Sequence, residues 1–119
     1  MATKKTETVE PIVFVNGETG ESVTIEFNRS VVLRMEREGF TGEKIAGMID
    51  DAPVSTVADL WYYGMLMHQP ETTREEAYDF FFDNIGFDEG IIERLARLFE
   101  KPYTDMMNAQ RKNSRWTMK

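Results

Sequence analysis

The stretch STVADLWYYGMLMH, residues 55–68, decides how the rest of the chain is organised. At helical spacing one side of it is apolar, and the other side carries a single charge, Asp59, among further apolar residues. A helix that is apolar all round is buried in a core or covered by a partner. At about 14 residues it is roughly 21 Å long, which is too short to span a bilayer. The sequence therefore predicts either a central helix of the fold, or a helix that is half core, on its Trp61 side, and half docking surface, on its Tyr62 and Leu66 side.

Both ends of this helix have signals in the sequence. Ser55 or Thr56 is the predicted N-cap, because a hydroxyl can accept a hydrogen bond from the first free backbone N–H groups. Pro70 ends the helix. Gly64 lies inside it, where glycine costs about 1 kcal/mol relative to alanine. We therefore expect a neighbouring helix to approach closely at Gly64.

The flanking segments predict a mainly α (α+β) fold, with an N-terminal β-hairpin followed by about four to five helices in one small domain. Residues 12–27 contain an apolar run and an alternating run, joined by a turn with Gly17 and Gly20. A lone two-stranded sheet is marginal in water, so its apolar face must pack on helices. The predicted helices cover residues 29–38, 43–49, 55–68, 74–84 and 89–100.

Capping residues support two of these helix starts. Asn28 is the predicted N-cap of the helix at 29–38. Before the helix at 74–84, Thr72 stands three residues ahead of Glu75 and Thr73 three residues ahead of Glu76. Either pair is typical of a capping box.

The domain bounds follow from composition. Residues 1–10 are polar and are predicted to be disordered. Residues 11–104 are the predicted globular domain, and Pro102 is expected to interrupt its last helix. Residues 105–119 form a basic tail, helical or frayed, whose cations are Arg111, Lys112, Arg115 and Lys119.

The charge excludes one class of partner. The formal net charge is −7, and residues 11–109 hold 19 acidic against 8 basic side chains. Phosphate backbones repel such a body, so we do not expect the fold to bind nucleic acid. Binding through the tail alone stays an alternative, as does a tail that is only solvated. No apolar run is long enough to cross a membrane, and the N-terminal residues lack the apolar stretch of a secretion signal.

Candidate chemistry is sparse. The chain has no cysteine, which excludes disulfides and thiol catalysis. His68 is the only histidine; a general base needs a nucleophile and a metal needs further ligands, and the pattern offers neither, so we interpret it as a capping or packing residue. The carboxylates at 50–51 and 75–83 are interpreted as solvated faces, although carboxylate pairs can also bind cations. The sequence predicts no enzyme, no cofactor and no metal site.

A surplus of large apolar side chains is left once a core of this size is filled. Exposed together, they would form a partner-binding or self-association surface. Covered by the hairpin and the C-terminal segment, they would belong to the core. The residues are Leu33, Tyr62, Tyr63, Leu66 and Phe82.

Three segments in order carry a family resemblance: EFNRSVVLRMEREGF at 26–40, LWYYGMLMHQPETTREEA at 60–77 and IIERLARLFEKPY at 91–103. In these segments the chain resembles the small tail assembly chaperones of long-tailed bacteriophages and prophages of Gram-positive bacteria. The resemblance implies a non-enzymatic factor of the host cytoplasm, absent from the finished virion. Its partners would be the tape measure protein, which it keeps soluble, and the tail tube protein, which it helps to recruit. It also implies that a longer form can arise by ribosomal frameshifting near the end of the reading frame.

Other functions fit the same composition. A general protein-interaction module, such as an adaptor or an inhibitor, would use the same apolar helix surface. An enzyme or metal protein would have to use His68 with the carboxylates.

Overall fold

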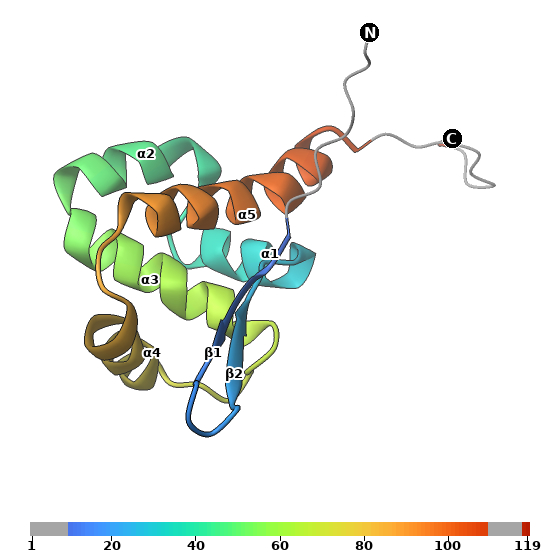
Figure 1. The fold of residues 1–119 in the computed structure, drawn as a ribbon. Helices are drawn as coiled ribbons and strands as arrows, with labels where there is room; N and C mark the ends of the chain where they lie inside the picture. Colours follow the sequence, from blue (N-terminus) through green and yellow to red (C-terminus); the bar gives the residue numbers. More distant parts are fainter. Residues whose placement is uncertain (1–9, 110–117) are drawn as a thin grey trace, which may run out of the picture.

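A two-stranded β-hairpin lies against a group of five helices (Figure 1). The structure, a computed structural model, describes residues 10–109 and 118–119. Its elements in chain order are β1 (Ile12–Val15), β2 (Ser22–Ile25), α1 (Arg29–Arg37), α2 (Gly42–Asp51), α3 (Pro53–Leu66), α4 (Arg74–Phe80), the π-helical turn η1 (Phe81–Ile85) and α5 (Glu89–Met107). The predicted mainly α fold with an N-terminal hairpin is confirmed. The prediction for residues 1–10 lies outside the described residues except for residue 10.

The hairpin forms as its alternating pattern predicts. The strands are antiparallel, with Ile12 opposite Ile25 and Val15 opposite Ser22. The Asn16 side chain accepts hydrogen bonds from the first backbone N–H groups of the turn, and Gly20 has a positive φ of 81°. Ile25 is completely buried against the helices. The hairpin is therefore stabilised through its inner face.

Helix α3 lies at the centre and contacts β2 and the helices α1, α2, α4 and α5 (Figure 1). It begins two residues before the predicted start, at Pro53, because proline suits the first helical position, where no N–H is needed. The predicted cap at Ser55 or Thr56 is wrong: Ala52 is the N-cap and provides no side-chain bond. Thr56 is buried instead, and its hydroxyl donates to the carbonyl of Met48 at 3.0 Å.

The close approach predicted at Gly64 is made by the hairpin and not by a helix. A Cβ atom at Gly64 would lie 2.5 Å from Cγ2 of Ile25, which no real pair of carbon atoms tolerates. The Gly64 carbonyl also accepts a hydrogen bond from the backbone N–H of Glu26 at 3.0 Å. The absence of a side chain at Gly64 thus lets β2 reach the backbone of α3.

The segment predicted as one helix at 74–84 has two parts. Thr73 and Glu76 form the capping box, which settles the choice between the two predicted pairs. After Phe80 the chain widens into η1, where the N–H of Gly86 donates to the carbonyl of Phe81 at 2.8 Å. Gly86 then takes a positive φ of 78° and ends the turn.

The predicted interruption of the last helix at Pro102 is wrong. Helix α5 continues through Pro102 to Met107, so the predicted domain boundary at 104 falls inside a helix. Packing of the neighbouring Tyr103 offsets the backbone hydrogen bond that Pro102 cannot donate. Tyr103 stacks on Phe99 with ring centroids 5.4 Å apart, and its ring takes the space beside Gly42 where a Cβ atom would be. Of the predicted tail, residues 110–117 lie outside the described residues.

Candidate protein-binding surface

The tyrosine side of α3 is covered by arginines from two other helices. The guanidinium of Arg74, at the start of α4, lies 4.4 Å from the ring centroid of Tyr62 and 5.4 Å from that of Tyr63. Arg34 of α1 donates to the Tyr62 hydroxyl at 3.2 Å. Cations over aromatic faces attract the rings and exclude water from them. Tyr62 is therefore only 6% exposed and Tyr63 is not exposed at all.

Carboxylates complete this network. Glu38 of α1 accepts a hydrogen bond from the Tyr63 hydroxyl and pairs with Arg34 at 3.0 Å. Asp59 of α3 pairs with Arg74 at 2.7 Å and accepts a bond from the Tyr78 hydroxyl. Three helices are thereby joined by charged and phenolic groups.

Within this network, the pKa values of the hydrogen-bonded pair Tyr63 and Glu38 are shifted in opposite directions. Burial, together with the hydrogen bond to Glu38, raises the pKa of Tyr63 to about 12. The hydrogen bond from Tyr63 lowers the pKa of Glu38. Both shifts favour a protonated phenol that donates to an ionised carboxylate. This is the chemistry of a structural contact, since neither group is poised to exchange a proton near neutral pH.

The exposure expected for three of the five predicted contact residues is therefore wrong, because Tyr62, Tyr63 and Leu66 are all buried. For the two tyrosines the physical reason is the reach of arginine, whose long stem covers apolar surface while its charged head stays wet. Leu66 belongs to the hydrophobic core cluster. Leu33 and Phe82, the other two, are exposed, at 39% and 45%, on α1 and η1.

His68 lies just past the end of α3. Its Nε2 is 2.8 Å from a carboxylate oxygen of Glu26, and both side chains are partly exposed. Within residues 10–109 and 118–119, no group of three or more histidine, aspartate or glutamate side chains could hold a metal ion. The same part of the chain has no helix long and apolar enough to cross a membrane.

Exposed aromatic side chains occur together at η1. Phe82 and Phe87, which we call the aromatic pair, have ring centroids 6.3 Å apart and are 45% and 44% exposed. Both rings pack edge-on against Phe81, which is completely buried. The pair is therefore held in place from beneath while its outer faces meet water. Phe87 is not among the contact residues predicted from the sequence, although a phenylalanine between Gly86 and the cap at Asp88 has no helical face on which to be buried.

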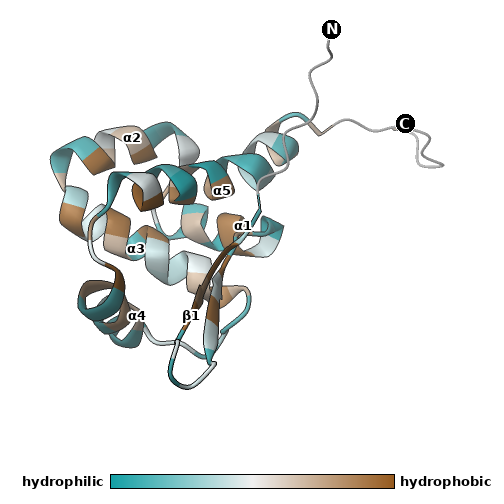
Figure 2. Cartoon of the chain, in the orientation of Figure 1, coloured by the Kyte–Doolittle hydropathy of each residue, from teal (hydrophilic) through white to brown (hydrophobic). Residues whose placement is uncertain are grey.

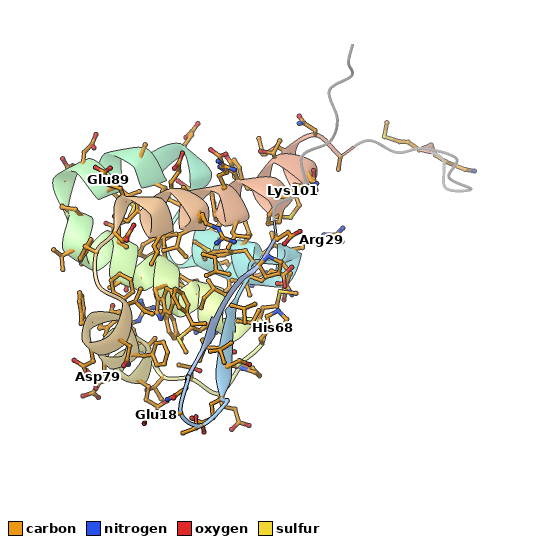
Figure 3. All side chains as sticks on the ribbon, in the orientation of Figure 1. Glu18, Arg29, His68, Asp79, Glu89 and Lys101 are labelled. Atoms are coloured by element: carbon orange, nitrogen blue, oxygen red, sulfur yellow. The ribbon has the colours of Figure 1, made fainter. Side chains whose placement is uncertain are left out.

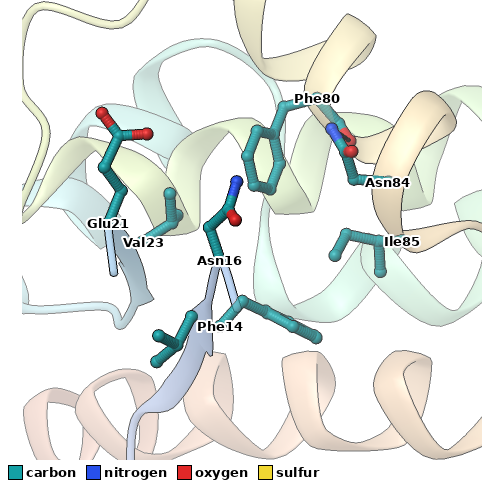
Figure 4. A pocket seen from close by; sticks show the side chains of 8 residues that line it. Phe14, Asn16, Glu21, Val23, Phe80, Asn84 and Ile85 are labelled. Atoms are coloured by element: carbon teal, nitrogen blue, oxygen red, sulfur yellow. Dashed lines mark hydrogen bonds between the residues drawn. The ribbon is translucent and has the colours of Figure 1, made fainter. Parts of the chain in front are cut away.

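A cleft of about 330 Å³ lies between the hairpin tip and η1 (Figure 4). Two of its lining residues pack on the buried Trp61, whose ring centroid lies 5.8 Å from that of Phe14 and is stacked with that of Phe80 at 6.1 Å. The Trp61 indole N–H has no hydrogen-bond partner among the described residues. The residues that line it come from both strands, the hairpin turn, the end of α4 and η1, and they are Phe14, Val15, Asn16, Glu21, Val23, Phe80, Asn84 and Ile85.

The aromatic pair and the cleft share the turn η1. Asn84 and Ile85 of this turn form one wall of the cleft, and Phe82 of the same turn is one of the two residues of the aromatic pair. Together they give a surface of aromatic and aliphatic side chains with a few polar groups, which is suited to a protein segment.

Comparison with known protein families gives a match over the whole sequence. The model of a family described as "Domain of unknown function (DUF5055)" matches residues 1–119, the full length of the chain. Neither the curated proteins nor the solved structures contain a match.

Proposed function

The chain belongs to the DUF5055 family, and we propose that it is a non-enzymatic tail assembly chaperone of a long-tailed bacteriophage or prophage. In this role it binds the tape measure protein, keeps it soluble and helps to recruit tail tube subunits around it. The proposal starts from the resemblance in residues 26–40, 60–77 and 91–103.

The observation that carries the proposal is the aromatic pair. Two phenylalanine rings that are nearly half exposed, side by side and supported from beneath, are unusual on a small domain. Such a surface matches the needs of a client rich in helical apolar stripes, which must be covered until assembly. Because the rings are held by Phe81, a client meets a preformed surface and little order has to be created on binding.

The test is co-expression with the tape measure protein encoded next to this chain. We expect the wild-type chain to raise the soluble fraction of the tape measure protein, measured after centrifugation. A variant with Phe82→Ser and Phe87→Ser should lose most of this effect while keeping a cooperative thermal transition.

Val54→Ser is the matched control. Val54 is a large apolar residue at the start of α3 with an exposed fraction of 56%, and it is not part of the aromatic pair. The control should behave as wild type. A further variant, Leu33→Ser, tests the other exposed residue among the contact residues predicted from the sequence. If the wild-type chain leaves the tape measure protein insoluble, the chaperone function is wrong. If the double variant rescues it fully, the aromatic pair is not the binding surface.

The gene neighbourhood separates this function from a general protein-interaction module. A tail assembly chaperone requires a tail tube gene before it and a very long tape measure gene after it. A different neighbourhood would favour an adaptor or an inhibitor that uses the same apolar surface.

A further inference from the structure

We propose that the outer edge of β1, with the cleft beside it, binds an extended basic segment of a partner protein as an added β-strand. This inference rests on the proposed function, because it places a client segment against η1, the turn that also contains Phe82 of the aromatic pair. It adds the mode of binding and the chemistry of the segment.

The outer edge of β2 is already covered. The Gln69 side-chain amide accepts from the backbone N–H of Thr24 at 3.1 Å and donates to the Thr24 carbonyl at 3.2 Å. Two residues further along the chain, the N–H of Glu26 donates to the carbonyl of Gly64 at 3.0 Å. The end of α3 thus takes the place of a third strand on this edge.

The same bonds show that the outer edge of β1 is open. In an antiparallel pair, residues facing each other alternate between hydrogen-bonded and non-bonded pairs. Thr24 gives its backbone groups to Gln69, so Val13 opposite it must point its own N–H and carbonyl away from β2. Val15, two residues on, does the same. Within the described residues these four groups have no hydrogen-bond partner.

Nothing in the sequence of β1 protects this edge. Natural sheets shield open edges with charged side chains, bulges or a covering element. Strand β1 has the sequence IVFV, without a charge, and is hydrophobic throughout (Figure 2). Val13 and Val15 are also exposed at their side chains, by 53% and 63%. An added strand would cover both the backbone groups and these side chains.

The cleft provides room for the inward side chains of such a strand. It lies between β1 and η1, with Phe14 on one side and Ile85 on the other (Figure 4). Because side chains alternate along a strand, every second residue of the segment would enter the cleft and the others would lie beside Val13 and Val15.

Charge determines the kind of segment. The hairpin region 11–27 has three acidic residues and no basic one, and region 75–89 on the other side has six and no basic one. Glu21 lines the cleft itself, and Figure 3 shows Glu18 at the hairpin tip and Asp79 on α4. Arg94 of α5 donates to the carbonyls of Glu10 and Pro11, at the beginning of the strand only. Carboxylates in and beside a partly apolar cleft attract a segment with lysine or arginine around its apolar residues and repel an acidic one.

The probe for the test is a synthetic peptide of alternating Val and Thr with paired Lys residues at each end. We expect it to bind the full chain, to perturb the backbone amide signals of Val13 and Val15, and to slow their hydrogen exchange. A peptide with Glu in place of Lys should bind at least about tenfold more weakly, and added salt should weaken the Lys peptide.

Two N-methylated forms of the Lys peptide isolate the backbone contribution. Methyl groups on the amides that face β1 should weaken binding at least about tenfold, while methyl groups on the alternate amides should leave it nearly unchanged. On the protein side, Val13→Pro removes one outward N–H and should weaken binding, whereas Val13→Thr retains that N–H and should bind. If Val13→Pro does not fold, the peptide pair still decides.

Each contrary outcome overturns the inference. Equal binding of both N-methylated forms rules out strand addition, and equal binding of the Lys and Glu peptides rules out a basic segment. If Val13 and Val15 are protected without peptide in proportion to protein concentration, the occupant is a second copy of the chain. If the amides of Val13 and Val15 are protected without peptide and deleting residues 110–119 abolishes this protection, the occupant is the chain's own basic end. Failure to solubilise the tape measure protein would refute the chaperone function alone, since these peptide measurements do not involve that protein.

Discussion

The substitution Gly64→Ala tests how closely β2 packs on α3. In an ordinary helix the change would stabilise the protein by about 1 kcal/mol, because alanine is the better helix former. At Gly64 the new methyl group would lie 2.5 Å from Cγ2 of Ile25 and 3.3 Å from Cζ of Phe27. Carbon atoms prefer separations of about 3.5–4.0 Å, so the strand must move by about 1 Å. Ile25 is completely buried and has no free space into which to move.

The magnitude follows from three contributions. Overpacking of a well-filled core costs about 1–3 kcal/mol. Moving β2 also weakens the bond between the Glu26 N–H and the Gly64 carbonyl, at about 1 kcal/mol. The gain in helix propensity offsets about 1 kcal/mol of this. We therefore expect Gly64→Ala to lower the free energy of unfolding by about 1–3 kcal/mol, measured by urea denaturation.

Gly47→Ala is the matched control within the same chain. Gly47 lies inside α2, and a Cβ atom there would meet nothing within 4 Å. This variant should be more stable than wild type by up to about 1 kcal/mol. The change Ile25→Leu removes the Cγ2 methyl group and should make Gly64→Ala less costly in the double variant. A Gly64→Ala protein as stable as Gly47→Ala would refute the reasoning.

Three further predictions concern the helices around α3. The pKa of Tyr63 is raised to about 12 in the folded state. Its contribution to stability is therefore complete below its ordinary pKa near 10 and is lost as the pH rises from 10 through 12. The variant Tyr63→Phe should reduce this loss of stability at alkaline pH, measured by urea denaturation at several pH values. Arg74→Met should lower the free energy of unfolding by about 1–3 kcal/mol, because Asp59, with a side chain only 16% exposed, loses its cation. Arg34→Met should cost less, since the ion pair of Arg34 with Glu38 is more exposed. Equal losses in the two variants would argue against this explanation. Thr73→Ala should cost about 1 kcal/mol of the unfolding free energy, while Thr72→Ala should cost clearly less, because Thr73 is the residue whose hydroxyl caps α4.

Local patterns predicted the elements whose causes are local. The hairpin follows from strict alternation and a turn rich in asparagine and glycine, and both cause and effect lie within residues 12–27. Asn28 and Thr73 cap their helices as expected, because a cap depends on residues within one turn.

The errors have distant causes. Pro102 stays inside α5 because Tyr103 packs on Phe99 and beside Gly42, and Gly42 is far away in the sequence. Tyr62 is buried because Arg34 and Arg74 reach it from two other helices, and these residues look like ordinary surface cations in the sequence. No periodicity within α3 carries that information.

The exposed apolar surface is displaced from α3 for a physical reason. A central helix can hide both of its sides when one side meets apolar neighbours and the other meets arginines that pair with carboxylates around the tyrosines. The large apolar side chains that the core does not bury then have to lie at the edge of the domain, where helices end. The turn η1 is such a place, and its wide hydrogen bond from Gly86 to Phe81 interrupts the regular helical order of the phenylalanines. Turns of this kind are frequent at functional sites because they give up regular packing for the placement of particular side chains. Here Phe81 is buried, Phe82 is exposed and Ile85 lines the cleft, so this irregular turn supports both the aromatic pair and the wall that faces the open edge of β1.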